Sequence, residues 1–130
     1  MNPAEISEYD LGLPVPIASL EERRRRVPPA IRARLERTKA SVAALLGPRL
    51  REVRLFGSYA RGQFTDVSDV DVLILVERLD EGDRERIVEA VVRAGGIILS
   101  PLILTTAQLD SLRARELLIA QDLDREGITL

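Results

Sequence analysis

One stretch of the chain, residues 55–76, constrains the fold and the chemistry more than any other. It begins with an apolar run that breaks at Gly57-Ser58 and continues into residues compatible with a helix. After a polar loop the chain enters a second apolar, β-branched run, and Asp69 and Asp71 stand two positions apart at its start. Because side chains at i and i+2 of a strand lie on the same face, we expect both aspartates to point the same way.

Each half of this stretch has a chemical consequence. Two carboxylates held side by side repel each other unless a cation lies between them, and a hard divalent cation prefers oxygen ligands of this kind. If the Gly57-Ser58 turn opens a helix, it offers free backbone N–H groups and the positive end of the helix dipole to an anion such as a phosphate. A phosphate cradle beside a pair of acids indicates one site for a metal-bound nucleotide.

The motif resembles the signature of a known superfamily. Gly57-Ser58, ten further residues and then Asp69-Val70-Asp71 are similar to the signature of the DNA polymerase β-like nucleotidyltransferases, and the match extends to Arg61-Gly62 and to Ser68. In length and layout the chain resembles the minimal nucleotidyltransferases of prokaryotes, which are often encoded beside a helical partner protein of the HEPN class. The resemblance covers roughly residues 30–110.

The resemblance implies roles for five residues. Asp69 and Asp71 are expected to be the catalytic carboxylates and the ligands of Mg²⁺ or Mn²⁺. Gly57 and Ser58 are expected to hold the triphosphate of ATP or another nucleoside triphosphate, and Arg61 to contact a phosphate.

The third predicted strand departs from the family pattern. Active members of the superfamily usually carry a third carboxylate there, whereas residues 97–104 contain no acid. Ser100 is the polar side chain of this run and the best candidate for the vacated position. A serine hydroxyl brings no charge and cannot act as a base near neutral pH, so whether the reaction survives is left open.

Two functions therefore compete. The first is transfer of a nucleoside monophosphate, AMP from ATP, to a hydroxyl on a HEPN-type toxin, which would make this chain an antitoxin. The alternative is a degenerate, weakly active or inactive domain that binds a nucleotide or docks on its partner. Transfer to a small molecule such as an aminoglycoside, or extension of a nucleic acid, would normally require a further binding module that the sequence does not show.

Composition limits the remaining choices. At 130 residues the chain is long enough for one domain with a real core, and a net charge of −2 from 19 basic and 21 acidic residues gives no global field for polyanions. The chain has no cysteine and no histidine, so any metal must be held by oxygen ligands. No apolar run reaches the roughly 18 residues of a membrane span, and we expect a cytoplasmic protein whose self-association is left open.

Periodicity and turn residues give the order of elements. We expect an N-terminal arm with a short basic helix over residues 1–28, and a nucleotidyltransferase domain over residues 29–130. Within that domain the pattern predicts helices over residues 29–46 and 59–63, a helix starting near Asp83, and one helix from residue 105 to residue 126; strands are predicted over residues 51–56, 70–76 and 97–104. The fold class is α/β (α+β), with a small mixed sheet of three strands, a fourth left open, flanked by helices.

The helix starting near Asp83 carries two further expectations. Asp83 is expected to be its N-cap, and its buried stripe is expected to consist of Ile87, Val88, Val91 and Val92.

Overall fold

The computed structural model of the chain describes residues 17–130, so residues 1–16 of the expected arm lie outside the described residues. The helices are α2 (Leu20–Arg26), α3 (Pro29–Leu46), α4 (Gly57–Arg61), α5 (Asp83–Gly95), α6 (Thr106–Ala114) and α7 (Leu118–Glu126), with a 3₁₀ turn at Gly47–Arg49. The strands are β1 (Leu50–Phe56), β2 (Val70–Val76), β3 (Leu99–Thr105) and β4 (Ile128–Thr129).

The four strands form one mixed sheet in the order β3-β2-β1-β4. β1 pairs antiparallel with both β2 and β4, whereas β2 and β3 are parallel. A parallel pair needs a crossover, which α5 supplies between β2 and β3. The expected mixed sheet is confirmed, and the short C-terminal strand β4 supplies its fourth strand.

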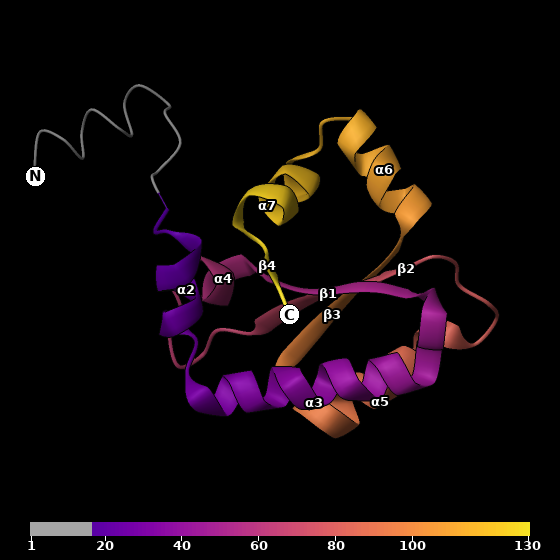
Figure 1. Cartoon of the computed structure of the whole chain (residues 1–130), viewed down its shortest axis with the longest axis horizontal. Coiled ribbons are helices and arrows are strands. Elements are labelled where there is room, and N and C mark those ends of the chain that lie inside the picture. The colour runs from indigo at the N-terminus through magenta and orange to yellow at the C-terminus, as the bar shows by residue number, and fades with distance from the viewer. Residues whose placement is uncertain (1–16) are drawn as a thin grey trace, which may run out of the picture.

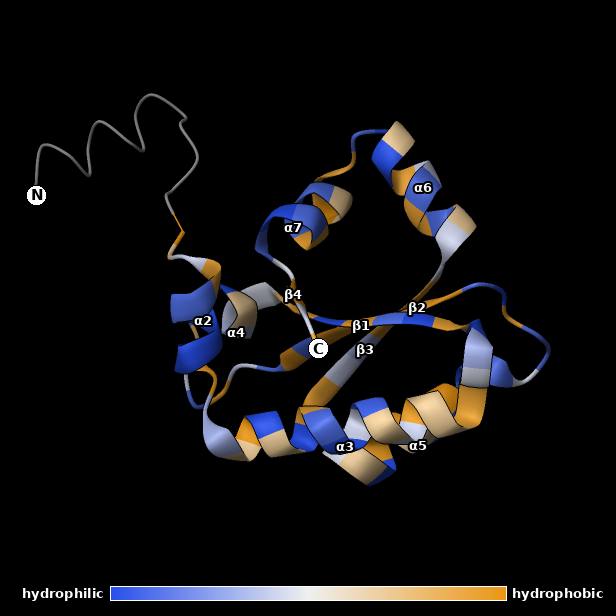
Figure 2. Cartoon of the chain, in the orientation of Figure 1, coloured by the Kyte–Doolittle hydropathy of each residue, from blue (hydrophilic) through white to orange (hydrophobic). Residues whose placement is uncertain are grey.

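Both faces of the sheet are covered, as the nearly continuous apolar sequence of β2 requires. Figure 1 shows α3 and α5 on one side of the sheet and α6 and α7 on the other. Alternate β2 residues divide between two cores: Val70, Val72, Ile74 and Val76 pack on the α3/α5 side, and Leu73 and Leu75 pack with residues of α6 and α7. Figure 2 shows the apolar residues concentrated where strands and helices face one another, while α2 is largely hydrophilic.

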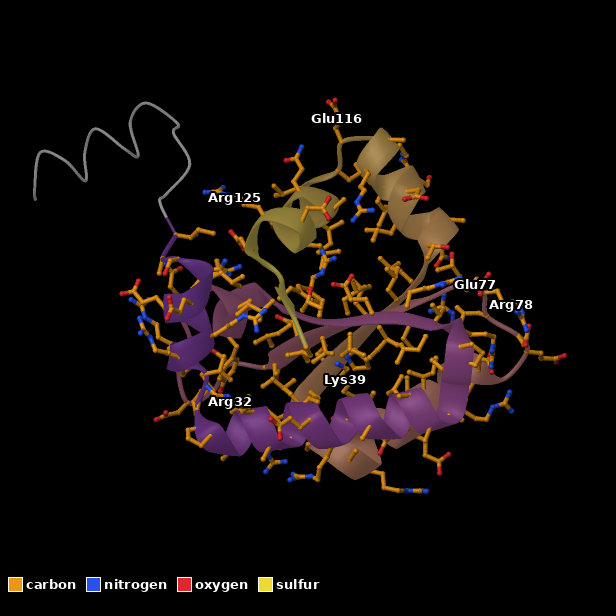
Figure 3. All side chains as sticks on the ribbon, in the orientation of Figure 1. Arg32, Lys39, Glu77, Arg78, Glu116 and Arg125 are labelled. Atoms are coloured by element: carbon orange, nitrogen blue, oxygen red, sulfur yellow. The ribbon has the colours of Figure 1, made fainter. Side chains whose placement is uncertain are left out.

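The predicted single helix over residues 105–126 is wrong, because the chain turns between α6 and α7. The N–H of Leu117 donates to the carbonyl of Leu112 (3.1 Å) and that of Glu116 to the carbonyl of Arg113 (3.0 Å), the hydrogen-bond pair of a Schellman cap. Such caps place a left-handed residue at this position, usually glycine, and here Glu116 has a φ of +52°. Figure 3 shows Glu116 at this turn, pointing away from the molecule.

Two details of α5 also differ from expectation. Gly82 is the N-cap, and Asp83 is instead the first helical residue. Ile87 and Val91 are buried, but Val88 and Val92 are 43% and 41% exposed, because the sheet covers only a narrow stripe of this helix. α6 begins with a capping box: the Gln108 N–H donates to Thr105 Oγ1, and the Thr105 N–H donates to Gln108 Oε1.

No helix among residues 17–130 is long and apolar enough to cross a membrane.

Candidate functional site

The site begins at Gly57, where β1 ends and α4 starts. Gly57 has a φ of +73°, a left-handed conformation that L side chains rarely adopt. Asp71 is the register partner of Phe56 on the neighbouring strand, and its carboxylate lies directly over Gly57. A Cβ added to Gly57 would collide with Asp71 Oδ2. Glycine is therefore required both for the turn and for the close approach of this acid to the start of α4.

Asp71 faces the α6/α7 side of the sheet. The flanking residues Val70 and Val72 belong to the core on the α3/α5 side, so the alternation of the strand directs Asp71 to the opposite face. Asp69 precedes the first residue of β2 and is exposed. Both acids belong to the wall of the same cavity, as their spacing predicts.

The two carboxylates repel each other. The pKa of the Asp71 carboxyl lies above its ordinary value, chiefly because burial disfavours the charged form and also because the negative charge of Asp69 is near. The positive charge of Arg61 opposes this rise. A divalent cation between the acids would offset the same repulsion.

Arg61 connects α4 with α7. Its Nη1 donates to Oε2 of Glu126 at 3.3 Å, and the Glu126 side chain is only 10% exposed. The guanidinium therefore forms an ion pair between α4 and α7. The Arg61 side chain also lines the cavity that contains Asp69 and Asp71.

All five residues singled out by the sequence meet in one open cavity of about 400 Å³. Its lining consists of Phe56, Gly57, Ser58, Arg61, Ser68, Asp69, Asp71, Ile119 and Asp122. A cavity of about 500 Å³ lies elsewhere, between α2, α3 and β4, and contains none of the five. The backbone turn, the serine hydroxyl, a guanidinium and a pair of carboxylates thus share a single space.

Ile119 and Asp122 are the lining residues that sequence reasoning missed. Both lie on α7, more than 45 positions from the motif, and no local pattern marks them. They reach the cavity because α7 packs over the sheet face to which Asp71 points, with Ala120 and Leu123 buried beneath it. Only the packing of α7 against α4 and β1 reveals them.

The third strand supplies no acid to this site. Ser100 on β3 is the register partner of Asp71 in the parallel pair, so the two side chains lie on the same face at neighbouring positions. Within residues 17–130 no group of three or more histidine, cysteine or acidic side chains could hold a metal ion. The donor set is therefore Asp69 and Asp71, which could hold Mg²⁺ or Mn²⁺ if phosphate oxygens and water complete the coordination.

Comparison with protein families identifies the domain that carries the motif. The family model described as "Nucleotidyltransferase domain" matches residues 35–116. A curated protein of Methanocaldococcus jannaschii, described as a protein adenylyltransferase, is 39% identical over 69 residues, which is 50% of this chain and 70% of that protein.

Two solved structures share the fold. A toxin–antitoxin complex with AMP-PNP aligns with a TM-score of 0.51 and 22% identity, covering 72% of this chain and 70% of that chain. A mutant of the toxin–antitoxin MntA-HpeT aligns with a TM-score of 0.50 and 24% identity, covering 73% of this chain and 70% of that chain. The agreement is one of fold: the expected α/β domain with a mixed sheet flanked by helices.

Proposed function

Because this chain belongs to the nucleotidyltransferase domain family, we propose that it transfers AMP from metal-bound ATP to a hydroxyl of a partner protein. The supporting observation is the placement of the Asp71 carboxylate over Gly57, which joins the acid pair to the turn at the start of α4. The relative described as a protein adenylyltransferase supports the choice of a nucleotidyl group and a protein acceptor.

The partner we propose is a HEPN-type helical toxin, with this chain as its antitoxin. Two structures with the same fold are described as toxin–antitoxin complexes, which supports an acceptor that also assembles with the domain. The cavity is open to solvent, as a site that accepts a side chain of another protein requires.

Different residues of the cavity bind the triphosphate and the cation. Backbone N–H groups at Gly57 and Ser58, the Ser58 hydroxyl and Arg61 bind and orient the triphosphate. Asp69 and Asp71 hold a divalent cation, which when bound neutralises phosphate charge and positions the attacking hydroxyl. Because Gly57 has no side chain, the turn that binds the phosphates and the acid pair lie close enough to contact the same bound nucleotide.

A second candidate function is binding without transfer. It is favoured by the sequence of β3, which places Ser100 beside Asp71 where active members usually carry an acid. In this case the domain would bind a nucleotide, or its partner alone, and neutralise the partner by docking.

The double variant Asp69→Asn with Asp71→Asn tests whether these two residues hold the cation. Loss of both charges is expected to abolish Mg²⁺-dependent ATP binding, while the fold stays intact or becomes slightly more stable because the repulsion is removed. Isothermal titration with ATP and Mg²⁺, together with thermal unfolding, measures both effects. Equal nucleotide affinity in the wild type and the double variant would contradict the metal-site assignment.

The transfer itself is tested with α-labelled ATP, Mg²⁺ and the helical protein encoded beside this chain, or a host lysate if there is none. A labelled protein band that disappears with the double variant supports nucleotidyl transfer. ATP binding without any labelled band supports the binding module instead.

A further inference from the structure

We propose that Asp122, on α7, accepts the proton of the attacking hydroxyl in this site; the proposal rests on the nucleotidyl transfer proposed above. This assigns the role of general base to α7, because β3 contains no residue that can act as a base near neutral pH. The two carboxylates of the motif would bind the cation, and a third carboxylate from another wall of the cavity would serve the acceptor.

Asp122 is half-buried and lines the same cavity as Ser58, Asp69 and Asp71. Ile119, Asp122 and Glu126 follow one another at helical spacings of three and four, so they share one face of α7. The Glu126 end of this face is fixed to α4 by its ion pair with Arg61.

Among residues 17–130, Asp122 differs from the other acids of α7 because no cation pairs with it. α7 carries three acids. Asp124 accepts two hydrogen bonds from Arg113, at 2.6 and 2.9 Å, and Glu126 pairs with Arg61. Within the described part of the chain, by contrast, no hydrogen bond or ion pair holds the Asp122 carboxylate. A half-buried acid that lines the same cavity as two others and has no cationic partner among the described residues does not stabilise the fold, which points to a role in binding or catalysis.

The other polar groups of the cavity wall are either engaged by the nucleotide and the cation or cannot act as a base. In the proposed function the phosphates engage Gly57, Ser58 and Arg61, and the cation engages Asp69 and Asp71. The chain contains no histidine, and Ser100 beside Asp71 is not a base near neutral pH. Asp122 does not form a three-acid metal site with the motif pair, because residues 17–130 contain no such group. It is the remaining carboxylate of the cavity wall that is free to act on the acceptor.

In the proposed step one P–O bond forms and another breaks. The acceptor hydroxyl oxygen attacks the α-phosphorus, forming a new P–O bond. The bond from that phosphorus to the oxygen bridging to the β-phosphorus breaks, and pyrophosphate leaves with the electron pair. The hydroxyl proton passes to an Asp122 carboxylate oxygen and from there to water.

The test compares Asp122→Asn with Asp66→Asn in the full chain. Asp66 is an exposed loop residue outside the cavity lining, so its variant removes the same charge without touching the site. Rates of label transfer from α-labelled ATP are measured with the acceptor protein, and ATP affinity is measured separately with Mg²⁺. Asp122→Ala is assayed with and without added formate, because a small carboxylate can replace a missing base but cannot restore a missing structural contact.

We expect Asp122→Asn to lower the transfer rate about 100-fold or more, the usual contribution of a general base, with ATP affinity within a factor of about two of the wild type. Formate should restore part of the rate of Asp122→Ala. If Asp122→Asn transfers label as fast as Asp66→Asn in an active wild-type background, the role of Asp122 is overturned and the proposed function stands. If the wild type transfers no label, the proposed function fails and this inference fails with it.

Discussion

At the scale of the single residue, the site depends on one glycine and the acid above it. Gly57 occupies a left-handed conformation and leaves room for the Asp71 carboxylate, so the two positions constrain each other. In the sequence, Gly57 and Asp71 are linked only because both belong to a motif with a fixed spacing. The structure gives the reason: the end of β1 and the start of β2 are register partners, and no Cβ fits between them.

Gly57→Ala is expected to destabilise the fold and to displace Asp71. A left-handed conformation costs a non-glycine residue roughly 1–2 kcal/mol, and the collision with Asp71 adds to this. Gly47→Ala is the matched control, because Gly47 also has a positive φ (+57°) but no heavy atom within 4 Å of its added Cβ. Both variants should unfold at lower denaturant concentration, but only Gly57→Ala should lose Mg²⁺-dependent ATP binding. Retained binding in Gly57→Ala would contradict the geometry of the site.

Asp83 shows how a single buried carboxylate can make stability depend on pH. Its Oδ2 accepts from Arg49 at 2.5 Å and from the Asp80 N–H at 2.6 Å, and its Oδ1 accepts from Arg86 at 3.1 Å. These hydrogen bonds, that of Arg49 foremost, hold the pKa of Asp83 far below its ordinary value. The carboxylate thus ties the start of α5 to the loop after β2 and to the turn before β1.

Asp83→Asn is therefore expected to lower the free energy of unfolding at pH 7. A depressed native pKa stabilises the protein fully above the pKa of the unfolded chain, about 3.9, and this contribution disappears as the pH falls toward the native value. The difference between wild type and variant should be largest at neutral pH and shrink below about pH 4. Denaturant titrations between pH 7 and pH 2 measure it, and a difference that does not change with pH would contradict the assigned ionisation.

At the scale of the element, the turn between α6 and α7 decides where the third acid of the cavity lies. The Schellman cap at residues 112–117 ends α6 and lets α7 fold back over the sheet. The sequence conceals this cap, since its left-handed position is occupied by Glu116 instead of glycine. The prediction of one continuous helix failed for that reason. Without the turn, nothing in the sequence indicates that Asp122 lies in the cavity that contains the motif.

Glu116→Gly is expected to stabilise the protein by about 0.5–1 kcal/mol. Glycine removes the left-handed strain of about 1–2 kcal/mol, and part of the gain is lost because it also increases the entropy of the unfolded chain. Glu36→Gly, at an exposed position within α3, should instead destabilise by about 1 kcal/mol. Opposite shifts in the urea midpoint would support the cap, whereas equal losses would show that Glu116 is not held in the left-handed conformation.

At the scale of the whole molecule, the site is a junction of segments that are distant in sequence. α4 lies between α2 and α7, and the buried Arg23 of α2 donates through Nη1 to the carbonyls of Ala60 (3.0 Å) and Glu126 (2.5 Å). One guanidinium thus joins α2, the end of α4 and the end of α7. The division of the chain at residue 28 into an arm and a domain stays a prediction, although α2 packs against α4.

Arg23→Ala is expected to destabilise the protein by about 1–3 kcal/mol, because it leaves two buried carbonyls without their donor. Arg25→Ala is the matched control on the same helix: its long ion pair with Glu21, 3.9 Å, lies in solvent and contributes at most about 1 kcal/mol. Guanidinium denaturation of both variants gives the comparison. Equal losses would mean that the buried Arg23 contacts do not hold the three elements together.

Local patterns in the sequence predict the shape of the segments that carry the motif. A nearly continuous apolar, β-branched run predicted β2, and strand alternation predicted the common direction of Asp69 and Asp71. A short helix was predicted over residues 59–63, after the Gly57-Ser58 turn, and α4 begins two residues earlier, at Gly57. These predictions succeeded to within two residues because strand alternation and the turn preference of glycine depend on a few neighbouring residues. The family was also predicted from this motif, and the family model confirms it.

The packing of helices on the sheet, in contrast, brings distant residues to that motif. Ile119 and Asp122 reach the cavity, Arg61 pairs with Glu126, and Ser100 lies beside Asp71 because of strand register and helix packing. These contacts arise when α7 buries Ala120 and Leu123 on the sheet, so no spacing along the chain encodes them. Local rules fix the shape of each segment, but the burial of apolar surface between segments fixes their relative positions.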